Sequence, residues 1–149
     1  MAIAALVAWV LTALGGFLML ARWISHGGLG QQHDGATRFP AGLVFTHLGL
    51  AAAGLVLWII YLLTDVHRLA WVAFVLLVPV ALLGFTMLAR WIPTRRPVAV
   101  GTRGQPARTI AEPDPAERHL PVPVVVAHGA FAVATLVLVL LTALEASGS

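Results

Sequence analysis

Apolar and polar positions divide this chain into four long apolar runs separated by polar connections. The four runs contain no Asp, Glu, Lys or Arg and cover residues 2–21, 41–64, 69–89 and 122–144. Each run provides roughly the 20 residues with which a helix crosses about 30 Å of hydrocarbon. Because backbone groups in lipid must pair internally, the pattern predicts transmembrane helices at about 2–24, 41–64, 69–92 and 122–144.

The first apolar run has some features of a cleaved signal peptide, but three observations argue against cleavage. It has no basic segment before it, it is too long for the apolar part of a signal, and it ends on Arg22 and Trp23 instead of small residues. We therefore expect a permanent span. Residues 1–149 are predicted to form a single integral membrane domain of the all-α class.

Composition and charge narrow the function and predict an orientation. Hydrophobic residues make up 60% of the chain, charged residues make up 10%, and cysteine is absent, which excludes disulfides and thiolate metal sites. Eight of the nine arginines lie in the two longer connections: Arg22, Arg38, Arg90, Arg95, Arg96, Arg103, Arg108 and Arg118. By the positive-inside rule both connections face the cytoplasm and both termini face outward, so the basic excess reflects topology and not nucleic-acid binding. The use of Arg to the exclusion of Lys is typical of GC-rich bacteria, which predicts a bacterial inner membrane.

The sequence repeats itself at two offsets. "GFLMLARWI" at 16–24 returns as "GFTMLARWI" at 84–92, with eight of nine letters unchanged and an offset of 68. Aligning Pro40 with Pro121 superposes His47 on His128, an offset of 81. Each unit contains two spans, so both copies cross the membrane in the same sense. We predict a four-helix bundle made of two parallel repeats of a helical hairpin.

The connections differ in length and composition. Residues 93–121 are rich in Pro, Gly and Arg, so we expect an irregular loop with one short helical turn before the last span. The turn at 65–68 is too short to separate its helices, which predicts antiparallel neighbours. Five aromatic residues near the ends of the spans are interpreted as interfacial anchors: Trp58, Tyr61 and Trp71 near this turn, and Trp23 and Trp91 at the other boundary.

Two repeat-related histidines, His47 and His128, are the only His, Asp, Glu, Lys or Arg side chains inside the four apolar runs. Each comes about six residues after its helix begins, so both lie about 9 Å below the membrane boundary at 1.5 Å per residue. Gly16 and Gly84 lie six residues before Arg22 and Arg90, which places both glycines at the same depth. Intramembrane histidines indicate function, although histidine also stabilises helix pairs by hydrogen bonding.

A layer of two histidines and two glycines favours a flat prosthetic group. Two imidazoles can take both axial positions of one haem iron, and glycine leaves room for the ring. Arg22 and Arg90 are candidates to bind the haem propionates, because guanidinium binds carboxylate in bidentate fashion. Close helix packing is an alternative reason for the glycines, and marking the membrane boundary is one for the arginines. The candidate metal ligands are His47 and His128, and no residue is predicted to be catalytic.

With these residues placed, the chain resembles small four-helix b-type cytochromes of the membrane, such as the cytochrome b561-like group and one half of haem A synthase. The resemblance is carried by "FTHLG" at 45–49, "VAHGA" at 126–130 and the boundary arginines. It implies haem b and electron exchange with quinone or a partner protein. The b561-like group uses four histidines for two haems, whereas this chain has one intramembrane pair, which leaves a second haem without ligands.

Together these observations predict a membrane electron-transfer protein with one haem b, functioning as a subunit of a respiratory or quinone-linked oxidoreductase more than as a separate enzyme. Its expected partners are membrane lipid, other subunits of a redox complex or a second copy of itself. Two alternatives stay open. One is a haem-free accessory subunit that docks against other membrane helices, and the other is a small transporter, which the absence of broken helices disfavours.

Overall fold

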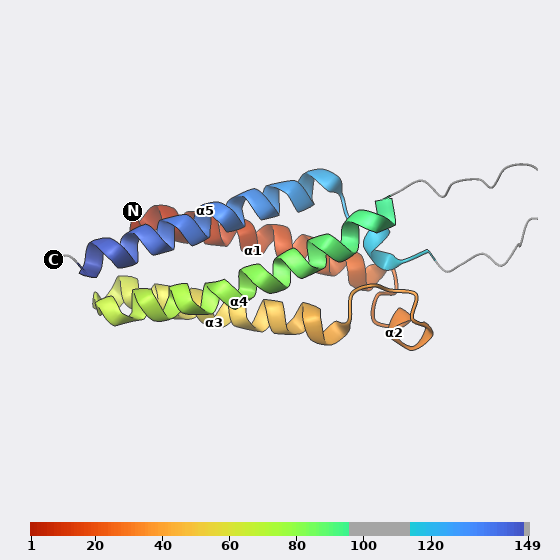
Figure 1. Ribbon diagram of the computed structural model, residues 1–149, viewed down its shortest axis with the longest axis horizontal. Coiled ribbons are helices and arrows are strands. Elements are labelled where there is room, and N and C mark those ends of the chain that lie inside the picture. The colour runs from red at the N-terminus through yellow and green to blue at the C-terminus, as the bar shows by residue number, and fades with distance from the viewer. Residues whose placement is uncertain (96–113, 148–149) are drawn as a thin grey trace, which may run out of the picture.

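The computed structural model describes residues 1–95 and 114–147, and within these residues every regular element is helical. Four long helices lie side by side along a common direction (Figure 1). They are α1 (Ala2–Ser25), α3 (Ala41–Thr64), α4 (His67–Trp91) and α5 (Val122–Ser147). Each is long and apolar enough to cross a membrane, so the four predicted spans are confirmed and the chain is a multi-pass membrane protein.

The long helices pack mainly in two pairs, α1 against α5 and α3 against α4. The pairs meet chiefly along α4 and α5, whereas α1 and α3 touch little. Consequently α3 and α5 lie diagonally across the bundle. The expected antiparallel packing of α3 on α4 is confirmed, and their tight turn depends on Asp65. This residue adopts a left-handed conformation with φ 54°, and its N–H donates to the Tyr61 carbonyl at 2.8 Å.

Both termini and the α3–α4 turn lie at one end of the bundle, and the α1–α3 and α4–α5 connections lie at the other (Figure 1). We call the latter the connection end. It contains α2 (Gln31–Asp34) and two 3-10 turns, η1 (Ile92–Arg95) and η2 (Ala116–His119). The η2 turn is the short helical turn expected before the last span. Residues 93–95, which were also expected to be irregular, instead form part of η1, and residues 96–113 of the expected loop lie outside the described residues.

Two separate clusters of buried side chains hold the helices together. The cluster near the termini consists of Ala5, Trp9, Trp58, Tyr61, Ala70, Ala73, Leu77, Val139 and Ala143. The cluster at the connection end consists of Trp23, Phe39, Val44, Trp91, Ala116 and Leu120. Large apolar side chains such as Leu82 and Phe85 are more than half exposed, as expected for surfaces that face lipid. The candidate histidines and glycines lie between the two clusters along the helices.

The two tryptophans of the repeated nonapeptide belong to the core at the connection end. Trp23 is 2% exposed and Trp91 is 7% exposed. The interpretation of these side chains as anchors in the lipid interface is therefore wrong, because both indole rings face the bundle. It is also wrong for Trp58 and Tyr61, which are buried in the cluster near the termini. Each Nε1–H has a protein acceptor: Thr37 Oγ1 at 3.3 Å for Trp23, and the Glu117 carbonyl at 3.0 Å for Trp91. Burial of an indole is favourable when its N–H finds such a partner.

Candidate functional site

The bundle brings the two intramembrane histidines together from opposite sides. His47 comes from α3 and His128 from α5, and their ring centroids lie 6.4 Å apart with the planes inclined at 55°. Both side chains are only partly exposed. Because α3 and α5 are diagonal, the two rings approach each other across the bundle and not along a shared helix contact.

Each imidazole is held by a backbone carbonyl of the helix against which its own helix packs. His47 Nδ1 lies 3.0 Å from the Val80 carbonyl on α4, and His128 Nδ1 lies 2.8 Å from the Thr12 carbonyl on α1. A carbonyl oxygen only accepts, so Nδ1 must carry the proton in both bonds. In the neutral ring this leaves a lone pair on Nε2, and within the described residues neither Nε2 makes a hydrogen bond.

These contacts are made twice by residues that the sequence repeat relates. Thr12 and Val80 differ by 68, which is the offset of the nonapeptide, and the histidines differ by 81, which is the offset of the second repeat. The same side-chain atom therefore binds the same backbone group at both places. The histidine layer consequently consists of two equivalent halves, one in each tightly packed helix pair.

The two predicted glycines lie directly against the imidazoles. A Cβ built on Gly16 falls 3.2 Å from His128 Cε1, and one built on Gly84 falls 3.3 Å from His47 Cε1. By contrast, Gly49 and Gly129, which follow the histidines closely in sequence, have nothing within 4 Å of such a Cβ. The structure thus distinguishes glycines that face the histidine layer from glycines that face outward.

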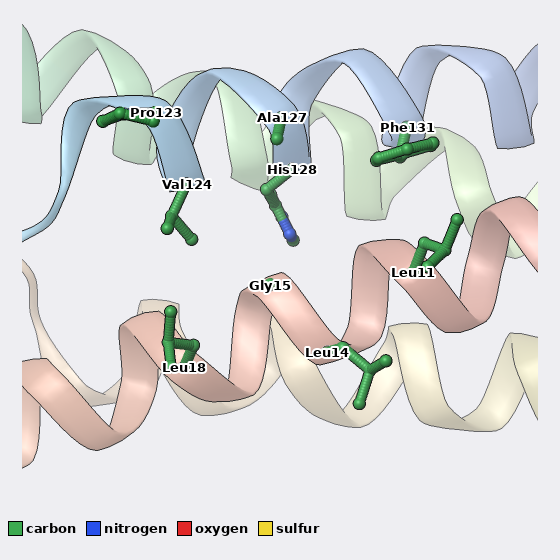
Figure 2. Close-up of a pocket in the computed structure, with 9 residues that line it drawn as sticks. All are labelled: Leu11, Leu14, Gly15, Leu18, Pro123, Val124, Ala127, His128 and Phe131. Carbon is green, nitrogen blue, oxygen red and sulfur yellow. The ribbon is translucent and has the colours of Figure 1, made fainter.

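A shallow groove of about 390 Å³ lies beside His128, between α1 and α5. It is lined by Leu11, Leu14, Gly15, Leu18, Pro123, Val124, Ala127, His128 and Phe131. Figure 2 shows His128 extending from α5 toward α1 at Gly15. The repeat places Leu83 at the position equivalent to Gly15, since 83 and 15 differ by 68. The duplicated sequence therefore departs from itself at the residue beside the imidazole.

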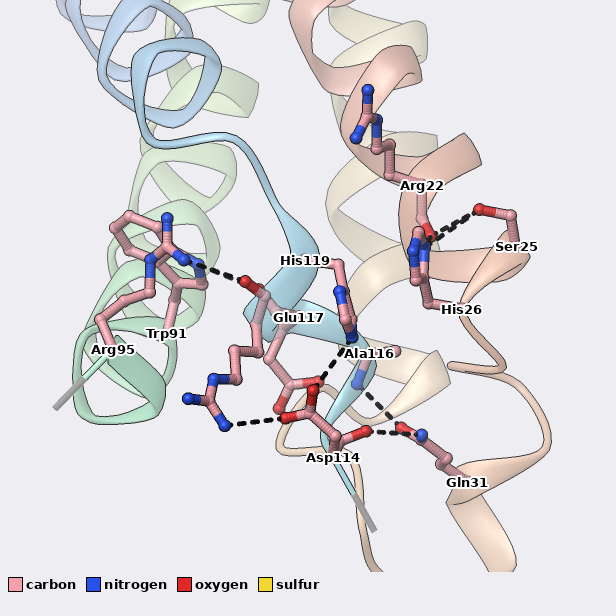
Figure 3. A network of polar contacts seen from close by, with 11 residues as sticks. Arg22, Ser25, His26, Gln31, Trp91, Arg95, Asp114, Ala116, Glu117 and His119 are labelled. Carbon is pink, nitrogen blue, oxygen red and sulfur yellow. Dashed lines mark hydrogen bonds and ion pairs between the residues drawn. The ribbon is translucent and has the colours of Figure 1, made fainter. Parts of the chain in front are cut away.

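The predicted arginines lie at the connection end and are used differently. Arg90 is exposed and donates through Nη1 to the Arg38 carbonyl at 3.0 Å. Arg22 is also exposed, and within the described residues its side chain makes no hydrogen bond. Figure 3 shows its backbone carbonyl, which accepts from Ser25 Oγ at 2.9 Å and lies 2.8 Å from His26 Nδ1. Neither guanidinium holds an imidazole of the histidine layer.

A polar cluster at the connection end was not anticipated from the sequence. Glu117 of η2 is fully buried, and its carboxylate accepts from Thr37 Oγ1 at 2.8 Å and from the Arg38 backbone N–H. The Gln31 side chain binds both the Asp114 carbonyl at 3.0 Å and the Ala116 N–H at 2.9 Å (Figure 3). The second connection is thereby fastened to the first. One glutamate in a proline-rich segment gives no periodic signal, so sequence reasoning had nothing with which to detect this contact.

The remaining described histidines do not form a metal site. His26 and His119 stack with centroids 4.2 Å apart and planes inclined at 15°, and His119 Nε2 lies 3.2 Å from Asp114 Oδ2. Among residues 1–95 and 114–147, no three or more His, Asp or Glu side chains are arranged to hold a metal ion. The stack joins the two connections, in the same way as Gln31 and Glu117.

The histidine layer offers two imidazole nitrogens, and their spacing can be compared with that of two imidazoles bound to one metal ion. A metal ion held between two imidazole nitrogens at about 2 Å each brings the ring centroids to roughly 6 Å, close to the observed 6.4 Å. A bare zinc ion requires about four ligands, and the layer offers two imidazoles. Haem iron takes its equatorial ligands from the macrocycle and needs only the axial pair. Two Nε2 lone pairs therefore suit haem better than a bare ion.

Comparisons of the chain with protein-family models, curated proteins and solved structures gave no match. The residues and their geometry are accordingly the basis for the function proposed below.

Proposed function

We propose that the protein is a membrane electron-transfer protein that holds one haem b between His47 and His128. The observation that carries the proposal is the facing pair of imidazoles, 6.4 Å apart, each with Nδ1 bound to a carbonyl and Nε2 unused among the described residues. Hydrogen bonding of the second ring nitrogen is how proteins orient metal-binding histidines.

The proposal includes an architecture of two parallel hairpin repeats, α1 with α3 and α4 with α5. The matching offsets of 68 and 81 support it, as do the identical histidine contacts on α1 and α4. Each repeat contributes one histidine to the other repeat's nonapeptide helix, since His128 binds α1 and His47 binds α4. Duplication would therefore have produced both axial ligands at once.

Bound haem would supply one-electron redox chemistry, and the residues of this chain would hold and orient it. The imidazoles would provide the axial ligands, and Gly16 and Gly84 have no side chain that would fill the space beside the imidazoles. Arg22 and Arg90 lie six residues from these glycines, about 9 Å along their helices, where their exposed guanidinium groups would bind propionates. None of these residues is catalytic.

The proposed setting is a bacterial inner membrane with the connection end in the cytoplasm and the termini outside. The arginines at the connection end support this orientation through the positive-inside rule. The protein would work as a subunit of a respiratory or quinone-linked oxidoreductase, or as a homodimer, exchanging electrons with quinone or another subunit. Membrane lipid surrounds the exposed apolar faces.

An absorption spectrum of the detergent-purified protein from haem-sufficient cells tests the proposal. We expect a red protein with the spectrum of a six-coordinate bis-histidine haem. His47→Ala and His128→Ala should each abolish that spectrum, whereas His67→Ala, in the exposed outer turn, should retain it. Equal pigment in all three variants, or a colourless and folded wild type, contradicts the proposal and favours the haem-free accessory subunit.

A further inference from the structure

The carbonyls that bind the imidazoles occupy a particular place relative to the two glycines. Thr12 lies four residues before Gly16, and Val80 lies four residues before Gly84. A helical side chain leans toward the helix N-terminus and covers the turn before its own Cα. Any side chain at position 16 or 84 would therefore lie over the carbonyl that the histidine uses.

These carbonyls can serve two donors at once. A carbonyl oxygen has two lone pairs, and the helical bond from the residue four positions later uses only one. The second lone pair is normally shielded by the side chain above it. At Gly16 and Gly84 that shield is absent, and the imidazole of the neighbouring helix takes its place.

We infer that Gly16 and Gly84 are positioning residues that open the carbonyls of Thr12 and Val80 to His128 and His47. Each glycine thereby fixes its imidazole in the tautomer with the proton on Nδ1 and the lone pair on Nε2. The use of that lone pair as a haem ligand rests on the proposed function, whereas the tautomer itself does not. This role differs from the one expected from the sequence, where the glycines made room for the macrocycle.

Distances indicate how sensitive the arrangement is. A Cβ at 3.2 Å or 3.3 Å from Cε1 is tighter than an ordinary carbon contact, so the ring must retreat by a few tenths of an ångström. Cε1 adjoins Nδ1, so this retreat lengthens bonds that now measure 2.8 Å and 3.0 Å. Gly129 and Gly49 offer matched controls, because a Cβ at either position meets nothing within 4 Å.

Nitrogen NMR of histidine-labelled protein in detergent micelles tests the inference directly, because the protonated and unprotonated ring nitrogens have separate resonances. Among the six histidines, the resonances of His47 and His128 are assigned by their loss in His47→Ala and His128→Ala, respectively. In the haem-free wild type we expect both rings to carry the proton on Nδ1. Gly16→Ala should shift the Nδ1–H signal of His128, because its hydrogen bond lengthens, and leave that of His47 unchanged. Gly84→Ala should do the reverse. Gly129→Ala and Gly49→Ala should change neither.

The outcomes separate this inference from the haem proposal. A proton on Nε2 of either ring in the wild type overturns the inference, even if a glycine variant does not fold. Signals that respond equally to Gly16→Ala and Gly129→Ala also overturn it. A protein that never binds haem but shows both glycine-dependent tautomers supports the inference and rejects the haem. A protein that binds haem, but whose histidine signals are unchanged by Gly16→Ala and Gly84→Ala, supports the haem proposal and rejects the inference.

Discussion

The two copies of the repeated nonapeptide begin alike and end differently. At their first residues, Gly16 and Gly84 face imidazoles at almost the same distance, 3.2 Å and 3.3 Å. At their last residues the environments diverge. Trp23 donates to a threonine hydroxyl, whereas Trp91 donates to the backbone carbonyl of Glu117. Eight identical letters of nine thus produce equivalent contacts inside the membrane and different contacts at the connection end.

The reason lies in what surrounds each part. Between the two ends of the bundle, Gly16 and Gly84 each meet a histidine, and these two histidines are related by the offset of 81, so the two contacts correspond. At the connection end they meet two connections of unequal length, and only the second provides Glu117. The difference teaches that repeated residues make matching contacts where their partners also match in sequence, and different contacts where the partner segments differ in length.

The largest effect is expected from Glu117, which has no counterpart in the first connection. Glu117→Ala removes a fully buried side chain and leaves the partly buried Thr37 hydroxyl and Arg38 N–H without their acceptor, so the free energy of unfolding should fall by about 2–3 kcal/mol. Thermal unfolding in detergent, followed by helical circular dichroism, measures the change. Glu145→Ala, at an exposed glutamate near the end of α5, is the control. Equal unfolding midpoints for both variants would show that the contacts of Glu117 do not stabilise the bundle.

A smaller but still clear effect is expected at Gly28, which belongs to the first connection alone. A Cβ at Gly28 would overlap the indole ring of Trp23, a rigid and buried group. Overpacking of this kind should lower the free energy of unfolding by about 2 kcal/mol in Gly28→Ala. Gly30→Ala is the control, because its Cβ comes no closer than 3.5 Å to the Gly27 carbonyl. Tryptophan fluorescence during unfolding measures the stability of both variants. An unchanged free energy of unfolding in Gly28→Ala would contradict the observed packing of Trp23 against Gly28.

The tryptophans themselves should respond unequally. Trp91→Phe loses a 3.0 Å bond to the Glu117 carbonyl and should cost about 1 kcal/mol of unfolding free energy. Trp23→Phe loses a 3.3 Å bond to a hydroxyl and should cost less. Chemical denaturation of the two variants side by side gives the difference. A larger loss for Trp23→Phe than for Trp91→Phe would contradict the expectation that the hydrogen bond of Trp91 contributes more to stability.

The smallest effects are expected from the arginines. Arg90→Gln removes an exposed hydrogen bond to the Arg38 carbonyl and should lower the unfolding free energy by less than about 1 kcal/mol, whereas Arg22→Gln should leave it unchanged. The amount of haem retained during detergent washing tests whether Arg22 and Arg90 bind the propionates. Comparable loss of haem from both variants supports propionate binding, and full retention in both would limit the arginines to the membrane boundary.

Much of the fold followed from the sequence because its signals are periodic or local. Uninterrupted apolar runs defined all four spans, and the short turn at 65–68 required α3 and α4 to be neighbours. The level shared by His47 and His128 followed from counting residues along helices. The short distance between the two rings depends on which helices pack together, and the sequence does not give that information.

Other features depended on contacts between distant segments and could not be predicted. The direction of Trp23 and Trp91, inward instead of toward lipid, is set by acceptors more than ten residues away. The carbonyls of Thr12 and Val80 are invisible in sequence, because every residue has one. Only the spacing of four between each carbonyl and its glycine was present in the letters, and its meaning needed the neighbouring helix.

The diagonal placement of α3 and α5 has a mechanical consequence. Each imidazole ties together the two helices of its own pair, His128 joining α5 to α1 and His47 joining α3 to α4. Anything bound by both rings would then add a link between the two pairs, which otherwise meet chiefly along α4 and α5. Loading and assembly would be thermodynamically linked, so that an empty apoprotein would be the looser and more easily degraded form.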